Sequence, residues 1–249
     1  FIWLVISSLK TEGEIFSVPI KWLPEKAQWS NYLEAIESAP FGTYYFNSLK
    51  ISFFKIAGAI FFSALTAFAF AKLWFRGKNK LFLIYLATMM IPPQVTLIPT
   101  YIIMSRIGWV NTHLPLIIPG MFSAYFTFML RQFYLSIPDS LIEAAKIDGY
   151  GYFRIFLTII LPLSKSALIS MSVVLFVWTW NDVLTPLIYL DSQRLYTVAQ
   201  GMGVFKKEYF TEFSLLFAAS VVSLVPLLIA YLLGQRFFQK GLATSGIKG

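Results

Sequence analysis

Long apolar runs separated by short charged segments dominate the chain. Three of these runs carry no charged residue, and each reaches the roughly 20 residues that an α-helix needs to cross a bilayer. They cover residues 81–105, 107–130 and 213–235. Two more runs hold isolated charges, with Asp182 in residues 166–190, and Lys50 and Lys55 in residues 47–71. The pattern therefore predicts five complete transmembrane helices.

The chain opens in another apolar segment, residues 1–8, which is too short to span a bilayer by itself. We interpret this segment as the end of a truncated first helix, which raises the expected number of spans to six. Apolar residues make up 57% of the 249 positions and charged residues only 13%, against roughly 25% charged in an average soluble domain. We predict an all-α fold, in which residues 1–249 form a single polytopic transmembrane domain.

Charge sets the orientation of the spans. The second span ends in a run of cations with no acid among them, and short cationic loops of this kind stay on the cytoplasmic side. The run consists of Lys72, Arg76, Lys78 and Lys80. Alternation of the spans then predicts a cytoplasmic loop at about residues 135–160, a cytoplasmic tail at 236–249, and outside loops at about 10–45 and 191–212. We expect both termini in the cytoplasm.

Several kinds of chemistry lack the residues they need. The chain has no Cys and one His, so it cannot supply a cluster of thiolate or imidazole metal ligands. It has no glycine-rich phosphate loop that ends in Gly-Lys-Ser/Thr, so ATP cannot bind by that route. The net charge of +8 is explained by cytoplasmic loops rather than by nucleic acid. We expect no catalytic residue, metal site or cofactor on this chain, and a surface position for His113.

The predicted cytoplasmic loop contains a short helix. Ser136 or Asp139 can cap its first amides, and Gly149 suits the left-handed residue after its last turn. Ala144 and Ala145 give the helix a small apolar face with charges beside it. Such a face fits docking against a partner, because small side chains permit close approach. From the residues alone, a plain solvated connector helix is the alternative.

The same loop carries a motif with fixed spacing. It reads Glu-Ala-Ala, three residues, Gly, nine residues and Ile-x-Leu-Pro, at Glu143, Ala144, Ala145, Gly149, Ile159, Leu161 and Pro162. The motif resembles the cytoplasmic-loop signature of the permease subunits of binding-protein-dependent carbohydrate ABC importers, in the MalG-like family. The likeness extends over nearly the whole chain, including Asn47-Ser48, Trp180-Asn181, Tyr196-Thr197 and the tail from Gln235.

The resemblance implies a transport role with no covalent chemistry on this chain. The chain would be one permease subunit of an ATP-driven oligosaccharide importer in a bacterial inner membrane, and would form half of a translocation pathway that works by alternating access. Its partners would be a second homologous permease, two ATPase subunits that bind ATP and Mg, an extracytoplasmic sugar-binding protein and membrane lipid, with no nucleic acid. A coupling helix would dock on the ATPase through Glu143, Ala144, Ala145, Asp148 and Gly149.

Three neighbouring residues are candidates for a substrate path. Trp180 and Asn181 could line a route for sugar, because rings stack on sugar faces and amides bond hydroxyls, and Asp182 is an acid in apolar surroundings. An aromatic belt at the membrane interface and a solvated interfacial Asp are the alternatives.

The outside loop at about residues 191–212 is a candidate docking segment. In the related family such a loop meets the substrate-loaded binding protein, which makes Tyr196, Thr197 and Gly201 candidate contacts. A plain surface loop is the alternative.

An ion-gradient-driven secondary carrier is the rival class. Such carriers show buried ionisable relays, or broken helices in paired halves. Here Asp182 is the only acid near the core of a span, and no clear internal repeat is present. Prolines lie in several spans, where they act as tolerated kinks or as gating hinges. They include Pro92, Pro93, Pro99, Pro115, Pro119, Pro186 and Pro226.

Overall fold

The computed structural model describes residues 1–207 and 209–243, and these residues are helical without a β-strand, as the sequence predicts. A single-residue β-bridge joins Lys206 and Thr211. The chain divides into two compact units, each built from separate stretches of sequence. The predicted tail lies partly within the described residues, because the last helix runs to Ala243, and residues 244–249 lie outside them.

Unit 1 comprises Phe1–Ile51, Asn111–His113 and Val177–Ala230. It contains α1 (Ile2–Ser7), α2 (Glu12–Ile15), α3 (Ser30–Glu37), the first part of α4 (Phe41–Lys72), the end of α12 (Lys165–Trp180), α13 (Leu184–Tyr189), η4 (Gln193–Leu195), α14 (Val198–Gly201), η5 (Met202–Phe205) and the first part of α15 (Phe213–Ala243).

Unit 2 comprises Ser52–Val110, Leu114–Phe176 and the chain from Tyr231 onward. Besides the remaining parts of α4, α12 and α15, it contains α5 (Lys78–Ala87), η1 (Thr88–Met90), α6 (Pro93–Arg106), α7 (Leu114–Ile117), η2 (Pro119–Met121), α8 (Ala124–Leu135), α9 (Asp139–Ile147), α10 (Tyr152–Ile155), the π-helical turn η3 (Phe156–Ile160) and α11 (Leu161–Leu163).

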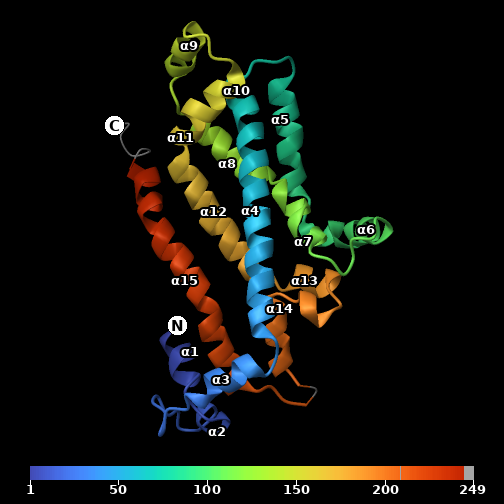
Figure 1. Cartoon of the computed structure of the whole chain (residues 1–249), viewed down its shortest axis with the longest axis vertical. Coiled ribbons are helices and arrows are strands. Elements are labelled where there is room, and N and C mark those ends of the chain that lie inside the picture. Colours follow the sequence, from blue (N-terminus) through green and yellow to red (C-terminus); the bar gives the residue numbers. More distant parts are fainter. Residues whose placement is uncertain (208, 244–249) are drawn as a thin grey trace. The chain divides into compact units, whose positions relative to one another are not determined.

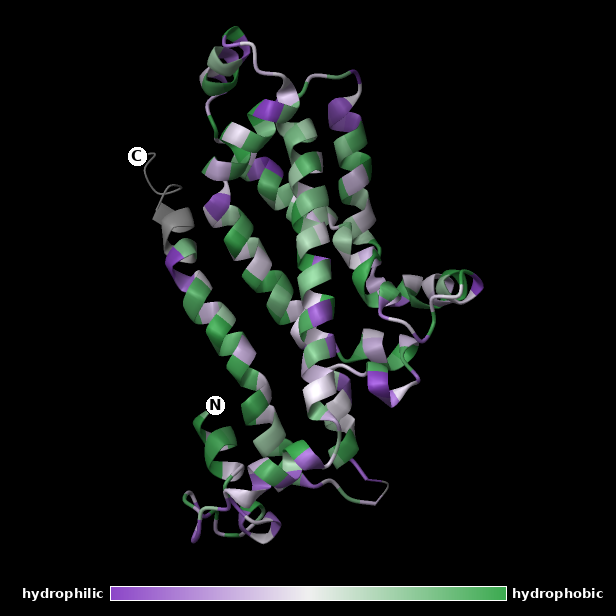
Figure 2. Ribbon diagram, viewed as in Figure 1, coloured by the Kyte–Doolittle hydropathy of each residue, from purple (hydrophilic) through white to green (hydrophobic). Residues whose placement is uncertain are grey.

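Three stretches are long and apolar enough to cross a membrane: Phe41–Lys72, Leu114–Leu135 and Phe213–Phe237. Figure 2 shows apolar residues along the length of α4 and α15. Two strongly bent helix pairs pass the same test together, which gives up to five spans by length and composition. The predicted sixth span stays a prediction, because its segment forms the six-residue helix α1.

The span predicted at residues 81–105 is not straight. Lys78–Met90 and Pro93–Arg106 form a pair bent by 94°. The bend falls at Pro92, which has an extended backbone with φ −61° and ψ 136°, and at Pro93, the first residue of α6. Because neither proline has an N–H to donate, the helical hydrogen-bond ladder stops here. By contrast, Pro99 and Pro226 lie inside continuous helices.

The spans predicted at residues 107–130 and 166–190 have different bounds in the structure. The first begins only at Leu114, because Gly108 and Asn111 adopt left-handed conformations with φ of 73° and 58°. In the second, α12 ends at Trp180 and α13 begins at Leu184. The part before it bends as well, by 73° between Tyr152–Leu163 and Lys165–Trp180.

The core of unit 2 joins small residues of α4 to large residues of α8 and η3. Ala59, Ala64, Ala67 and Ala71 are at most 8% exposed, and the cluster includes Phe126, Leu130, Tyr134, Ile155, Phe156 and Ile160. Small side chains let membrane helices approach closely. The closeness is direct at Gly58, where an added Cβ would collide with the Met121 side chain.

Candidate functional site

The predicted short helix in the cytoplasmic loop is α9, Asp139–Ile147. Figure 1 shows it as a separate helix, joined by loops to α8 and α10. Its last turn closes as predicted, because Gly149 is left-handed with φ 81° and the Tyr150 N–H donates to the Ala145 carbonyl at 2.9 Å. The proposed side-chain cap is wrong: the residue that precedes the first turn is Pro138, and no side chain caps the helix.

The two residues predicted as caps make other contacts. The Ser136 hydroxyl donates to the Phe133 carbonyl at 2.7 Å. Asp139 instead accepts a hydrogen bond from Lys72, with 2.6 Å between Nζ and Oδ1. The same ammonium donates to the Ile137 carbonyl at 2.6 Å, and its side chain is only 3% exposed. Lys72 therefore ties the start of α9 to the end of α4.

The ion pair changes the acidity of Asp139. The hydrogen bond from Lys72, and then the charge of Lys72, lower the pKa of the Asp139 carboxyl below its ordinary value. The carboxylate itself is 76% exposed, so water and salt screen the attraction, and its contribution to stability is at most about 1 kcal/mol.

Helix α9 has a buried side and an exposed apolar side. Ile142 and Ala145 are each 5% exposed and belong to the core of unit 2. Ile147 is 87% exposed and Leu141 44% exposed, and Ala144 is exposed beside them. Ala145 therefore packs against its own chain, whereas the face available to a partner, called here the outer face of α9, consists of Leu141, Ala144 and Ile147.

Charged residues surround this outer face. Glu143 and Asp148 are exposed and make no ion pair within the described part of the chain. Lys146 lies 4.5 Å from the centre of the Tyr152 ring, and Arg154 lies 4.0 Å from that of Tyr150. Such cation–π contacts hold the segment after α9 in place. The two carboxylates are left open to cations of a partner.

The predicted substrate-path residues divide into two groups. Trp180 is 2% exposed, its Nε1 donates to the Ser223 carbonyl at 3.0 Å, and its ring lies 5.7 Å from that of Tyr45. Its indole N–H is therefore bonded within unit 1, while the residue also lines a pocket of that unit. Asp182 accepts a hydrogen bond from the Thr185 N–H at 3.0 Å. This carboxylate therefore holds the first turn of α13 and has a structural reason to lie where it does.

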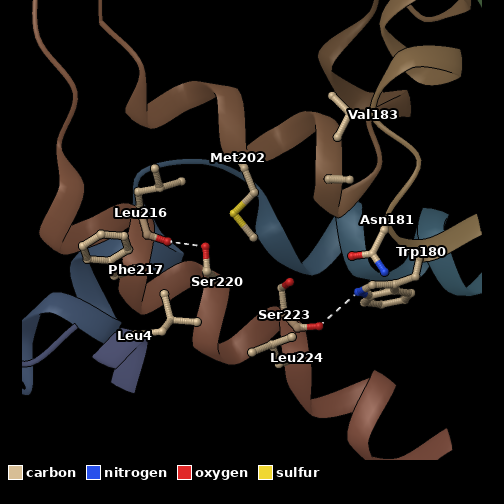
Figure 3. Close-up of a pocket in the computed structure, with 11 residues that line it drawn as sticks. Leu4, Trp180, Asn181, Val183, Met202, Leu216, Phe217, Ser220, Ser223 and Leu224 are labelled. Carbon is tan, nitrogen blue, oxygen red and sulfur yellow. Dashed lines mark hydrogen bonds between the residues drawn. The ribbon is translucent and has the colours of Figure 1, made fainter. Parts of the chain in front are cut away.

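Trp180 and Asn181 both line a pocket of about 390 Å³ in unit 1, whereas Asp182 is not among its lining residues. The walls come from α1, the last residue of α12 and the segment between α12 and α13, α14 with η5, and one face of α15. Figure 3 shows that Ser220 and Ser223 of α15 and Met202 of η5 point into the same space. The pocket combines apolar walls with a few hydroxyl and amide groups, as small-molecule sites do.

The predicted binding-protein contacts are mostly internal. Thr197 is 4% exposed, and its hydroxyl accepts from the Gln200 N–H at 3.3 Å at the start of α14. Gly201 is buried, and an added Cβ would collide with the Tyr44 ring. Tyr196 is half-buried against the same ring, with 6.1 Å between ring centres. These residues shape the loop rather than forming its exposed surface.

Residues that the sequence reasoning did not single out as site residues fix this loop. The Asn47 amide donates to the Arg194 and Tyr196 carbonyls at 2.9 and 3.0 Å. The Ser48 hydroxyl accepts from the Val198 N–H at 2.9 Å. Both polar side chains are buried in unit 1. One signal for these two residues was available in the sequence, which is that they are polar and lie in an apolar run. A buried polar group needs a hydrogen-bond partner.

Asn111 and His113 complete the support. Asn111 Oδ1 accepts from the Asp191 and Ser192 N–H groups at 3.2 and 2.9 Å, and Nδ2 lies 2.8 Å from the Ser192 hydroxyl. His113 Nε2 lies 2.8 Å from the Leu195 carbonyl, and the residue is 8% exposed. The expectation of a surface histidine is therefore wrong, because the loop after α13 covers it.

Within the described residues, no group of three or more His, Cys, Asp or Glu side chains is placed to hold a metal ion. With at least three stretches long and apolar enough to cross a membrane, the described part of the chain is that of a polytopic membrane protein. The chain belongs to the family described as the binding-protein-dependent transport system inner membrane component, which matches residues 59–243. It is thus an inner-membrane permease subunit of such an importer, and not itself catalytic. Membership weighs against the ion-gradient-driven carrier.

Named relatives agree over nearly their full length. The chain is 32% identical to the probable ABC transporter permease protein YurM of Bacillus subtilis, over 100% of this chain and 83% of YurM. It is 33% identical to the sn-glycerol-3-phosphate transport system permease protein UgpE of Yersinia enterocolitica, over 98% and 90%. It is 30% identical to the arabinooligosaccharides transport system permease protein AraQ of Halalkalibacterium halodurans, over 99% and 89%.

A solved structure shares the fold. In the crystal structure of a bacterial ABC transporter involved in the import of the acidic polysaccharide alginate, one chain superposes with a TM-score of 0.85 at 21% identity, covering 95% of this chain and 89% of that one. This likeness shows that the two chains share their fold.

Proposed function

We propose that this chain forms half of the translocation pathway of a sugar importer and that α9 couples it to a separate ATP-hydrolysing subunit. Relatives named for arabinooligosaccharides and for glycerol 3-phosphate support a polar, hydroxyl-bearing substrate. ATP and Mg would be bound by two ATPase subunits, and the remaining partners would be a second permease and an extracytoplasmic sugar-binding protein. The chain would act as one transmembrane domain with both termini in the cytoplasm.

The outer face of α9 is the observation that carries the coupling role. This helix has nine residues, and it leaves Ile147 87% exposed and Leu141 44% exposed. Contact with water is unfavourable for these apolar side chains, and a partner that covered them would remove that cost. Glu143 and Asp148 would set the register by pairing with cations of the ATPase, and Ala144 would allow close approach. Ala145 and Gly149 would contribute indirectly. Ala145 packs α9 on unit 2, and Gly149 ends the helix with a left-handed residue.

The test is purification of the assembly from its native membrane in mild detergent, with quantification of each co-purifying subunit. Ala144→Arg places a long charged side chain on the outer face of α9 and should reduce recovery of the ATPase at least about tenfold, equivalent to roughly 1.4 kcal/mol of binding free energy. Ala27→Arg is the matched control, because Ala27 is an exposed alanine in the predicted outside loop. Full ATPase recovery with Ala144→Arg would contradict the proposal.

A second variant separates docking from coupling. Glu143→Lys reverses the charge beside the outer face and should leave ATP hydrolysis running while uptake falls, because a misaligned contact transmits closure poorly. The measurement is the ratio of substrate accumulated to ATP hydrolysed in proteoliposomes. An unchanged ratio would remove Glu143 from the coupling role.

A further inference from the structure

The pocket in unit 1 has no charged group in its walls. Every side chain that lines its volume of about 390 Å³ is neutral, and most are apolar. The apolar part includes Leu4, Met202 and Phe217. A solute that enters this space therefore meets hydrocarbon surface and a small number of neutral polar atoms.

Those polar atoms have hydrogen-bonding capacity left over. The Ser223 hydroxyl makes no hydrogen bond within the described residues, whereas the Ser220 hydroxyl donates to the Leu216 carbonyl at 2.7 Å and can still accept. Asn181 Nδ2 donates to the Val177 carbonyl at 2.8 Å, which leaves its Oδ1 as an acceptor. Figure 3 shows Asn181 on one side of the space and the two serines on the other.

The backbone supports a binding role as well. Helix α12 ends at Trp180, and the chain is irregular until α13 begins at Leu184. Irregular backbone within apolar segments is tolerated where it is buried in protein or lines a cavity. Here the irregular stretch contributes Asn181 and Val183 directly to the pocket.

We infer that this pocket receives part of an uncharged saccharide and discriminates against anionic solutes. Saccharide hydroxyls both donate and accept, which matches Ser223 and Asn181, and the C–H faces of a sugar ring match the apolar wall. An anion would lose its hydration and find no cation in return, which is costly. A lipid chain would leave the polar atoms of Ser223 and Asn181 without partners.

This inference rests on the proposed sugar-importing function and narrows it. The names of the relatives and of the structural neighbour include a neutral class, arabinooligosaccharides, and two anionic ones, glycerol 3-phosphate and the acidic polysaccharide alginate. The uncharged lining of the pocket favours a neutral saccharide as the substrate of this chain.

The experiment uses the complete importer, with its own partner subunits and binding protein, in proteoliposomes. The vesicles receive a defined mixture of neutral trisaccharides (arabinotriose, maltotriose and raffinose) and anionic solutes (sn-glycerol 3-phosphate and a mannuronate trimer), and mass spectrometry measures ATP-dependent accumulation. We expect a neutral saccharide to exceed each anionic solute by roughly tenfold or more. Preferential uptake of an anionic solute would overturn the inference but leave the importer intact, whereas accumulation of neither class would contradict the proposed function itself.

A second experiment blocks the pocket by covalent modification and tests whether saccharide uptake depends on it. The chain has no cysteine, so Ser223→Cys introduces a single thiol that can be modified with benzyl methanethiosulfonate after the importer has assembled. Val225→Cys is the matched control, because Val225 lies on α15, is 48% exposed and does not line the pocket. Treated importer with no introduced cysteine controls for thiols of the partners.

The pocket assignment predicts that modification at residue 223 lowers saccharide uptake at least about tenfold, with modification at residue 225 having little effect. ATP hydrolysis stimulated by the loaded binding protein should persist, which shows that the assembly is intact. Uptake that survives complete modification at residue 223 would overturn the assignment and leave lipid as the occupant of the pocket.

Discussion

The loop that carries α9 and the loop that follows α13 are held in different ways. Helix α9 rests on two buried apolar side chains and on one cation, Lys72, which binds both Asp139 and the Ile137 carbonyl. The loop after α13 is held by neutral hydrogen bonds from several side chains, of which Asn47, Ser48 and His113 are buried and Asn111 is half-buried.

The difference assigns the two loops different mechanical roles. A helix held at few points keeps one face free, and Ile147 is 87% exposed on that face of α9. A loop held at many points has little freedom of its own, and Thr197 and Gly201 are buried within it. We propose that a partner contacts the exposed face of α9, whereas the loop after α13 forms a fixed support for neighbouring elements of unit 1.

The substitution with the largest expected effect disrupts the packing of the buried side of α9. Ala145→Arg would force a cation into the core of unit 2, where Ala145 is 5% exposed, and should lower the free energy of unfolding by roughly 3–5 kcal/mol. Thermal unfolding of the purified chain in detergent measures this loss. Ala144→Arg is the control, since its side chain can stay in solvent and stability should hardly change. Equal stability of the two variants would mean that α9 does not pack as described.

The substitution with the next largest expected effect removes hydrogen bonds that hold the loop after α13. Asn111→Ala removes the acceptor for two backbone N–H groups and places alanine at φ 58°. The left-handed backbone costs alanine roughly 1–2 kcal/mol, and the unpaired amides add about as much again. Hydrogen exchange at Asp191 and Ser192 should accelerate strongly.

Asn111→Asp provides the comparison for this variant, because it keeps an acceptor oxygen and loses only the donor to the Ser192 hydroxyl. Its exchange rates should stay closer to those of the natural chain. If Asn111→Ala left the amide exchange of the loop unchanged, the many-point support described here would be wrong.

A smaller effect comes from a matched pair of glycines. Gly201→Ala would push a Cβ into the Tyr44 ring, whereas Gly203→Ala meets no atom within 4 Å. Overpacking at Gly201 should cost roughly 1–3 kcal/mol, and the change at Gly203 should stay within about 0.5 kcal/mol. Comparing the unfolding midpoints of the two variants measures the difference. A loss at Gly203 as large as at Gly201 would exclude the contact with Tyr44 as its cause.

Local signals predict α9 well, and long-range packing explains what they miss. Gly149 correctly predicts the end of the helix that the structure places at Asp139–Ile147, because helix ends depend on neighbouring residues. The predicted cap at Ser136 or Asp139 is wrong, because the residue before the first turn is Pro138. Which side of the helix is buried depends on packing into the core of unit 2, which includes residues distant in sequence such as Ala67 and Phe68. The sequence could therefore predict an alanine pair but not that Ala145 faces inward.

The same limit applies to the spans and to the predicted sugar path. The Pro92–Pro93 pair predicts an interruption, but the 94° bend depends on packing around it. Trp180 was predicted to line a path because of its chemistry, and it lines the pocket of unit 1, but the sequence could not show that its indole is bound to the Ser223 carbonyl, 43 positions away. Ser223 itself lies in a charge-free run with no distinguishing motif, so only the fold brings it to Asn181.

The smallest expected effect concerns the ion pair between Lys72 and Asp139, whose contribution to stability should depend on pH. Because Lys72 lowers the pKa of Asp139, the ion pair contributes stability above the unfolded-state pKa of that carboxyl and loses it as the pH falls through the lower folded-state pKa. Asp139→Asn removes this contribution, so the stability difference from the natural chain should be at most about 1 kcal/mol at neutral pH and should vanish in acid. Lys72 keeps its bond to the Ile137 carbonyl, which limits the loss. Unfolding midpoints measured from pH 7 down to about pH 2 check the trend, and a difference that grew in acid would mean that another group anchors α9.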